Sequence, residues 1–130
     1  MKYPTYEQVV ELNRRILESS CSHFAKENNV QNPGSLNYAL ELIQTENSKA
    51  FLSIKSKIAK LSWAIIRGHI FWDGNKRTGI STMEAFAKMN GYKVDATDDE
   101  LFDIAMSIAT GSEYSYEDFV SWVEEYVIRK

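Results

Sequence analysis

The chain has 130 residues, of which 44% are hydrophobic and 25% charged, and its formal net charge is −3. This balance is typical of a soluble globular protein, and the length predicts one domain over residues 1–130. The acidic balance argues against wholesale binding to the backbone of a nucleic acid.

Cysteine usage and the chain start bear on the cellular compartment. The single cysteine, Cys21, cannot form an internal disulfide, which fits a reducing compartment. Residues 1–4 lack the apolar core of a signal peptide, and no apolar run approaches the roughly 20 residues that cross a bilayer. We therefore expect a cytoplasmic protein with no membrane contact.

The first predicted helix runs from Thr5 to about Ser19. Thr5 and Gln8 have the spacing of a capping box, and apolar residues recur behind them at helical spacing. A loop of about 14 residues, 20–34, follows and ends in the turn signal Asn-Pro-Gly. Long loops are often functional, so this loop is a candidate functional segment. Its His23 is interpreted as an ordinary polar residue, with a substrate or partner contact as the alternative.

Two further helices are predicted before residue 69. Ser35 is a candidate cap for a short helix that ends near Thr45. A longer helix is predicted from about Lys49, and its C-terminal half is apolar on most sides. Gly68 closes this helix, as glycine often does just past a helix end.

Three more helices complete the chain. One begins near Asn75 and ends at Asn90, and a short extended piece follows over residues 92–95. Capping boxes open the last two, at Thr97 with Glu100 and at Ser115 with Asp118. The pattern predicts an all-α domain of about six helices, with no internal repeat.

The densest group of polar residues lies between the two central helices. Residues 69–77 read His-Ile-Phe-Trp-Asp-Gly-Asn-Lys-Arg. The first N–H groups of a helix have no helical partners, and with the helix dipole they form an anion site. Gly74 permits the positive φ that such a turn usually requires, so backbone amides from Gly74 to Arg77 are expected to cradle a phosphate.

The cationic and amide side chains suit the same ligand. Arg77 can donate two parallel hydrogen bonds to phosphate oxygens, and Lys76 adds a point charge. Asn75 can fix either a phosphate oxygen or the loop itself. Arg67, just before the loop, is a further candidate for phosphate contact by proximity alone.

The remaining loop residues suggest a reaction. Asp73 supplies an oxygen ligand for magnesium, which proteins usually hold with one or two carboxylates plus substrate phosphates. His69 can accept a proton from an incoming hydroxyl near neutral pH. Phe71 is expected to anchor the loop in the core. Together the residues suit transfer of a phosphate-containing group from a nucleotide to a hydroxyl.

The loop residues are also compatible in part with other kinds of site. A transition-metal site at His69 and Asp73 needs three or four ligands, and only His23 remains to join them. The chain has no Walker A loop, and no second carboxylate is singled out for glycosidase chemistry. A tight turn between helices with incidental charges remains the alternative from the residues alone.

Residues 69–77 also resemble the motif of the Fic/Doc family. The general motif is His-Pro-Phe-x-Asp/Glu-Gly-Asn-Gly-Arg-x-x-Arg, and the death-on-curing branch has His-x-Phe-x-Asp-Ala/Gly-Asn-Lys-Arg, which this chain matches at all seven fixed positions. The length, the helical pattern and an Asn-Gly-Tyr at 90–92 fit the same branch. The resemblance implies a single-domain Fic/Doc (Fido) helical fold with the motif loop between two central helices.

The resemblance also implies an activity and residue roles. Fic proteins transfer AMP from ATP to a protein hydroxyl. By resemblance His69 is the general base, Asp73 holds magnesium, and Asn75 and Arg77 hold phosphates. Where the general motif has a second glycine and a final arginine, this chain has Lys76 and Ile80.

In the death-on-curing branch these departures accompany an inverted nucleotide, and the enzyme is a kinase. The branch implies a toxin that phosphorylates elongation factor Tu and is controlled by a small Phd-like antitoxin. Gly74 stands where that toxin has alanine, so AMP transfer stays open as an alternative. A non-catalytic binding module on the same fold is the alternative outside enzymes. The nearest match to the family's self-inhibitory motif, at Glu27-Asn28, has His23 where a serine or threonine is required. That absence favours control by a separate antitoxin.

Overall fold

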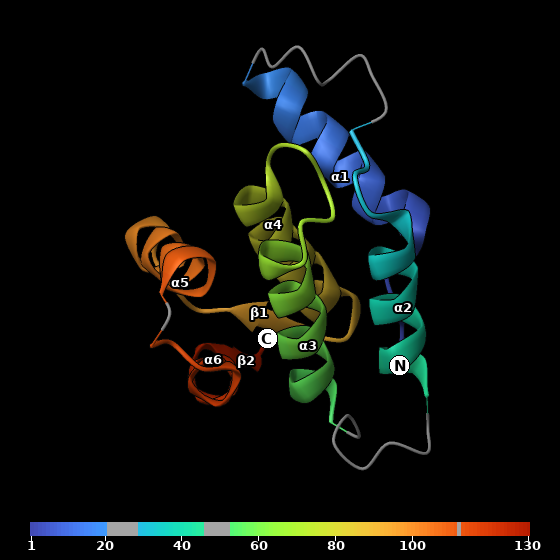
Figure 1. The fold of residues 1–130 in the computed structure, drawn as a ribbon. Coiled ribbons are helices and arrows are strands. Elements are labelled where there is room, and N and C mark those ends of the chain that lie inside the picture. The colour runs from blue at the N-terminus through green and yellow to red at the C-terminus, as the bar shows by residue number, and fades with distance from the viewer. Residues whose placement is uncertain (21–28, 46–52, 112) are drawn as a thin grey trace.

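The computed structural model describes residues 1–20, 29–45, 53–111 and 113–130, and within these ranges the chain forms six helices and one small sheet (Figure 1). The helices are α1 (Tyr6–Ser19), α2 (Pro33–Gln44), α3 (Ile54–Arg67), α4 (Asn75–Met89), α5 (Asp98–Thr110) and α6 (Tyr116–Tyr126). The strands are β1 (Tyr92–Val94) and β2 (Val127–Arg129). The predicted all-α fold, with the polar loop between two central helices, is confirmed.

Three predicted helix starts are confirmed in atomic detail. In each, the cap hydroxyl accepts a hydrogen bond from the backbone three residues on, and the side chain there accepts one from the cap backbone. These reciprocal pairs are Thr5 with Gln8, Thr97 with Glu100, and Ser115 with Asp118. Such pairs satisfy orphan N–H groups locally, which is why a sequence pattern of four residues finds them.

The predicted start of the second helix is wrong. Ser35 does not cap it, because α2 already begins at Pro33 with Asn32 as its N-cap residue. Proline fits the first helical position, where its missing N–H removes no helical hydrogen bond. The Asn-Pro-Gly sequence is therefore a helix start rather than a turn.

The predicted start of the third helix is also wrong. Ser53 is extended and its hydroxyl accepts a hydrogen bond from the Ser56 N–H, so α3 begins at Ile54 rather than near Lys49. Residues 46–52 lie outside the described part of the chain. The C-terminal half of α3 is buried on most sides as predicted, with Leu61, Ser62, Ile65 and Ile66 at 5% exposure or less.

The small sheet ties the C-terminus to the end of α4. The extended piece predicted after α4 is β1, and it pairs antiparallel with β2 in the register Tyr92 with Arg129 and Val94 with Val127. The sequence did not indicate β2, because three residues are too few to show an alternating pattern.

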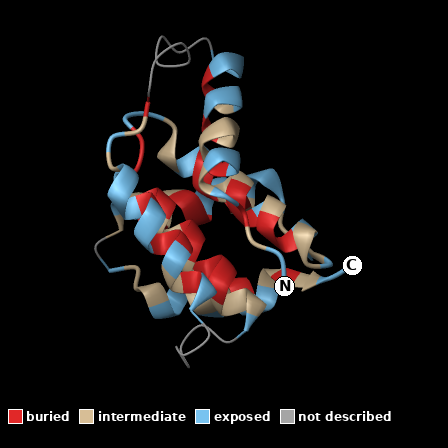
Figure 2. Ribbon diagram, turned by 90° about the vertical axis from the view of Figure 1, so that its right-hand side faces the viewer, coloured by how far each residue is buried: buried red, intermediate tan, exposed pale blue. Residues whose placement is uncertain are grey.

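Helices α3 and α4 form the centre of the fold. They lie side by side, and a Cβ added to Gly79 of α4 would approach Ile66 Cγ1 of α3 to 2.4 Å, so only glycine permits this contact (Figure 1). Buried residues line the helix faces turned toward this pair (Figure 2). The loop joining α3 to α4 therefore lies at one end of this closely packed central pair.

Candidate functional site

The loop between α3 and α4 follows a constrained path. The N–H of Gly68 donates to the Ala64 carbonyl at 2.8 Å and ends α3. His69 then takes a positive φ of 49°, which is uncommon for a residue other than glycine. Ile70 and Phe71 enter the core at 0% and 1% exposure. The buried pair fixes the middle of the loop and leaves His69 and Asp73 exposed on either side of it.

The start of α4 provides the backbone geometry of an anion site. Its N-cap residue, Gly74, is left-handed with φ 83°, and no side chain caps the helix. The first helical hydrogen bond runs from the Thr78 N–H to the Gly74 carbonyl at 2.9 Å. The N–H groups of residues 75–77 precede that bond and have no place in the helical pattern. Together with the helix dipole they favour an anion at this end of α4.

Asn75 locks the loop onto the start of the helix. Its Oδ1 accepts a hydrogen bond from the Phe71 N–H at 2.9 Å, and its Nδ2 donates to the Phe71 carbonyl at 2.8 Å. The side chain was expected to bind either a phosphate oxygen or the loop itself, and in the structure it binds the loop. The backbone N–H of Asn75 remains part of the helix start that faces an anion.

The two cations lie exposed on the first turn of α4. The Arg77 guanidinium donates to the Ser20 Oγ and, at 3.5 Å, to the Ser19 Oγ at the end of α1. Because a guanidinium carries five N–H groups, these two contacts leave donors for phosphate oxygens. Lys76 lies beside Arg77, and both side chains line one cleft.

Asp73 lies directly before this anion site. Its side chain is exposed, and its carbonyl oxygen accepts hydrogen bonds from the buried side-chain amides of Asn13 and Asn29. Within the described ranges, no three His, Cys, Asp or Glu side chains cluster closely enough to hold a metal ion. One carboxylate beside a phosphate cradle fits magnesium that arrives with substrate phosphates, rather than an ion held by protein ligands alone.

Comparison with protein families decides the identity of this constellation. The family model described as the Fic/DOC family matches residues 3–87, which is well over half of the chain. The chain belongs to the Fic/DOC family. The match spans α1 to α4 and so includes the whole Fic/DOC motif loop. No curated protein sequence matches the chain closely enough to be named as a relative.

The structure brings most of the predicted site residues together. Six of them lie within the motif loop and the first turn of α4: His69, Asp73, Gly74, Asn75, Lys76 and Arg77. Arg67 is placed differently, because its guanidinium lies over the Trp63 ring at 5.4 Å, on α3. His23 and the centre of the predicted 20–34 loop lie outside the described residues.

A cleft between α4 and α5 adjoins the motif and was not predicted. Its volume is about 630 Å³, within the usual range for small-molecule sites. It is lined by Lys76, Arg77, Ile80, Ser81, Glu84, Asp98, Leu101, Phe102, Ala105 and Met106. The one sequence signal for this cleft is Phe102, an aromatic residue outside the apolar stripe of its helix. Phe102 is 65% exposed. The cleft extends the anion site into a volume with apolar walls.

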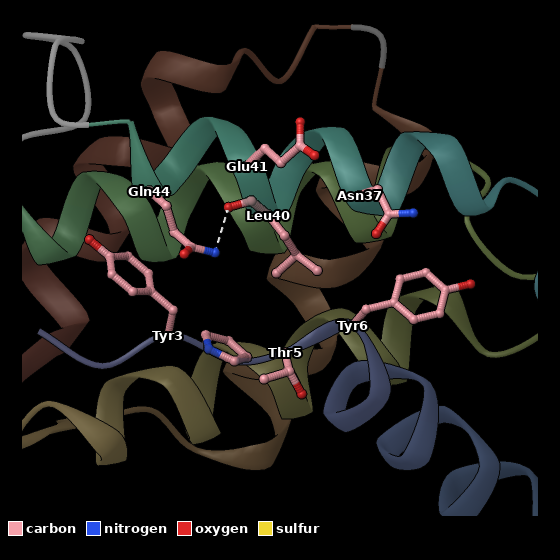
Figure 3. Close-up of a pocket in the computed structure, with 8 residues that line it drawn as sticks. Tyr3, Thr5, Tyr6, Asn37, Leu40, Glu41 and Gln44 are labelled. Atoms are coloured by element: carbon pink, nitrogen blue, oxygen red, sulfur yellow. Dashed lines mark hydrogen bonds between the residues drawn. The ribbon is translucent and has the colours of Figure 1, made fainter.

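Other features lie away from the motif. A cavity of about 320 Å³ lies between the N-terminal segment and α2, lined by residues such as Tyr3, Leu40 and Gln44 and by none from the motif loop (Figure 3).

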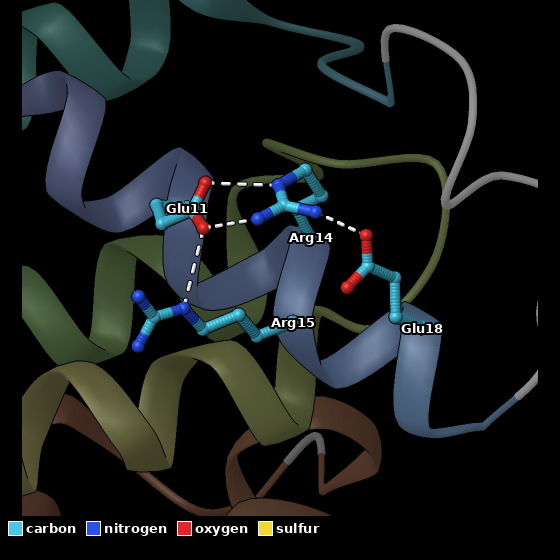
Figure 4. Close-up of polar contacts among 4 residues, drawn as sticks. All are labelled: Glu11, Arg14, Arg15 and Glu18. Atoms are coloured by element: carbon cyan, nitrogen blue, oxygen red, sulfur yellow. Dashed lines mark hydrogen bonds and ion pairs between the residues drawn. The ribbon is translucent and has the colours of Figure 1, made fainter.

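On α1, Arg14 joins Glu11 and Glu18, and Arg15 joins Glu11, in an exposed ion-pair network (Figure 4). Its arginines hold the pKa of Glu11 down at about 2. Among the described helices, none is long and apolar enough to cross a membrane.

Proposed function

We propose that this Fic/DOC protein transfers the γ-phosphoryl group of ATP to a hydroxyl group of a target protein. The observation that carries the proposal is the start of α4, where an uncapped helix end with Gly74 at φ 83° follows His69 in the motif loop and where Lys76 and Arg77 of the first turn line the cleft. Phosphoryl transfer depends mainly on positioning and on stabilising charge. A cradle of backbone N–H groups flanked by two cations supplies both.

The proposed reaction assigns one task to each motif residue. His69 takes the proton from the target hydroxyl, whose oxygen attacks the γ-phosphorus as the bond from that phosphorus to the bridging oxygen breaks and ADP leaves. Lys76, Arg77 and the backbone N–H groups at the start of α4 bind the phosphates and stabilise the charge of the transition state. Asp73 would hold the magnesium that accompanies ATP, and the ion would neutralise phosphate charge.

The departures from the general Fic motif support transfer of the γ rather than the α phosphate. Lys76 replaces a glycine and Ile80 replaces an arginine, and both side chains line the cleft. A lysine at the cradle competes with the usual phosphate placement, and the lost arginine removes a triphosphate contact. We propose that the nucleotide base and ribose occupy the apolar part of the cleft, near Leu101 and Phe102.

The biological role proposed for the chain follows from the family branch that it resembles. We propose a toxin that acts in the cytoplasm, modifies a protein of the elongation factor Tu type and is restrained by a Phd-like antitoxin. Growth arrest on expression, relieved by co-expression of such an antitoxin, is the expected behaviour.

AMP transfer is the second candidate, because Gly74 matches the general Fic motif at the position where the death-on-curing toxin has alanine. In that case the target hydroxyl attacks the α-phosphorus and diphosphate leaves. A non-catalytic binding module on the same fold is the alternative outside enzymes.

Labelled ATP separates the three functions in one experiment. The protein is incubated with Mg·ATP carrying label at the γ or the α phosphate, together with purified elongation factor Tu and, in parallel, a cell extract. We expect protein-bound label only from the γ position. Label only from the α position would establish AMP transfer, and no label from either position in both protein preparations would favour the binding module.

A further inference from the structure

We infer that three asparagines outside the motif, Asn13, Asn29 and Asn32, are positioning residues for the phosphate cradle and for His69. Their amides bind the loop carbonyls of Asp73 and His69. The inference rests on the proposed function and deepens it, since it assigns nucleotide binding and proton transfer to different asparagines.

Two buried amides converge on a single carbonyl. Asn13 Nδ2, from α1, donates to the Asp73 carbonyl at 3.0 Å, and Asn29 Nδ2 donates to the same oxygen at 2.9 Å. Asn13 Nδ2 also donates to Thr78 Oγ1 at 3.0 Å, and Asn29 Nδ2 to Asn13 Oδ1 at 2.8 Å. Each amide has two N–H groups, so these four contacts use every donor of both side chains. The two asparagines are 2% and 6% exposed, respectively, so water does not compete for these bonds.

The held carbonyl determines which way the next amide points. The peptide between Asp73 and Gly74 is trans, so its carbonyl and its N–H point in opposite directions. With the carbonyl turned toward the buried asparagines, the N–H of Gly74 points away from them. A half-turn of this peptide would replace an N–H donor by a carbonyl oxygen, which repels phosphate. Glycine adopts positive and negative φ about equally, so the loop sequence alone does not prevent that rotation.

Asn32 performs the corresponding task at the other end of the loop. It occupies the N-cap position of α2, yet its side chain makes no cap bond to its own helix. Instead its Nδ2 donates to the His69 carbonyl at 2.7 Å, and its backbone N–H donates to the Ile70 carbonyl at 3.0 Å. His69 has a φ of 49°, a conformation that a histidine does not favour by itself. The Asn32 amide therefore holds the proposed base in an unfavourable backbone state.

A role in stability alone is the competing explanation, and Asn90 offers a matched control. This asparagine lies at the other end of α4, where its Nδ2 donates to the Phe86 and Lys2 carbonyls at 3.0 and 2.8 Å. Its Oδ1 accepts from the Lys2 N–H at 2.8 Å. Removing its side chain breaks three hydrogen bonds to the backbone, more than any single change at the motif loop, and does so at the end of α4 away from the cradle.

The test compares Asn13→Leu, Asn29→Ala, Asn29→Ser, Asn32→Ala and the control Asn90→Ala. The dissociation constant of Mg·ATP is measured by calorimetry, the rate of label transfer is measured at saturating ATP, and folding is checked by thermal melting. We expect the Asn13 and Asn29 variants to bind Mg·ATP about 10-fold to 100-fold more weakly, as expected for a misplaced cradle. Asn32→Ala should bind Mg·ATP within about twofold of wild type but transfer label at least about 10-fold more slowly, as expected for a misplaced base.

The control and the wild type make the outcomes decisive. Asn90→Ala should lower the melting temperature while leaving nucleotide binding and transfer unchanged. Unchanged Mg·ATP binding in either folded Asn29 variant would overturn the inference, and so would equal weakening by Asn90→Ala. If the wild type itself neither binds Mg·ATP nor transfers label, the proposed function fails and the inference falls with it.

Discussion

The two ends of α4 are built with the same devices but leave different groups available. Each end has a left-handed glycine, Gly74 at φ 83° and Gly91 at φ 82°, and each has asparagine amides bound to backbone carbonyls. At the C-terminal end, the Asn90 amide donates to the Phe86 carbonyl of the helix, and the same side chain bonds the Lys2 backbone near the N-terminus of the chain. At the N-terminal end no side chain caps the helix. Similar local structure thus stabilises the fold at one end and leaves N–H donors for a ligand at the other.

This comparison separates residues that act on a ligand from residues that hold the chain. At the N-terminal end the asparagines hold the carbonyls of Asp73 and His69, which precede the helix, and not the N–H groups of its first turn. The helix end therefore keeps its positive potential, which a cap oxygen would partly neutralise. Substitutions at the two ends of α4 should therefore affect nucleotide binding differently.

The largest expected effect is on the chemical step. His69→Asn should lower label transfer by about 10²-fold to 10⁴-fold, the usual contribution of a general base, because the amide does not accept the proton. Asparagine tolerates a positive φ better than most residues, so the melting temperature should stay close to that of the wild type. Transfer at the wild-type rate would remove His69 from the mechanism.

The two glycines provide a direct test of the contrast between the ends of α4. Alanine at Gly91 adds strain but no contact, since no atom lies within 4 Å of the added Cβ, whereas at Gly74 that Cβ approaches Asn13 Nδ2 to 3.1 Å and Leu17 Cδ2 to 3.2 Å. A left-handed residue other than glycine costs about 1–3 kcal/mol. Denaturant unfolding should show a larger loss of stability for Gly74→Ala than for Gly91→Ala.

Nucleotide binding by the variants Gly74→Ala and Gly91→Ala provides the second test of the contrast between the ends of α4. Only Gly74→Ala should weaken Mg·ATP binding, because it displaces the cradle and the Asn13 amide that holds it. Equal weakening by Gly91→Ala would contradict the difference drawn between the two ends.

Arg77 at the cradle and Arg14 on α1 allow a comparison of two exposed arginines. Arg77→Ala should weaken Mg·ATP binding about tenfold, or ~1.4 kcal/mol, by removing a charged donor at the cradle. Arg14 belongs to the exposed network on α1 (Figure 4), and Arg14→Ala should leave binding unchanged, since exposed ion pairs contribute little. Calorimetry measures both variants, and a similar loss in the two would point to a general charge effect rather than to a site.

The smallest expected effect concerns Glu84 in the cleft. Burial, and to a lesser extent the nearby Asp98, raise the pKa of Glu84 above its ordinary 4.5. The folded state thus holds this proton more tightly than the unfolded state, so stability falls as the pH rises from 4.5 through the raised pKa. Glu84→Gln removes this loss and should stabilise the protein at pH 7 by no more than about 0.5 kcal/mol. Thermal melting across pH should show the variant and the wild type diverging as the pH rises.

Features that the sequence predicted depend on residues close together in the chain, whereas features that it missed depend on residues far apart in the chain. The capping boxes and the left-handed Gly74 depend on neighbours within four residues, so local rules find them. The bonds from Asn13, Asn29 and Asn32 to the motif loop span 60, 44 and 37 residues. No periodicity marks such contacts, and an isolated asparagine in a sequence usually reads as a turn or cap residue.

The two misplaced helix starts have a similar origin. Serine residues suited to a cap stand at both Ser35 and Ser53, and the choice between neighbouring helix starts depends on Pro33 and on the packing of α3 rather than on the cap alone. The cleft between α4 and α5 needed both helices in place before its lining residues formed one surface. In the sequence, Phe102 is marked only as an aromatic residue outside the apolar stripe of its helix, and its exposure became known with the structure.

The most direct test of the central claim is an amide-resolved NMR titration with Mg·ATP. If the start of α4 binds the phosphates, the N–H signals of Gly74, Asn75, Lys76 and Arg77 should shift most, while those of Asn90 and Gly91 at the other end of the helix stay in place. Shifts confined to the cavity between the N-terminal segment and α2 (Figure 3), or no shifts at millimolar Mg·ATP, would contradict the account.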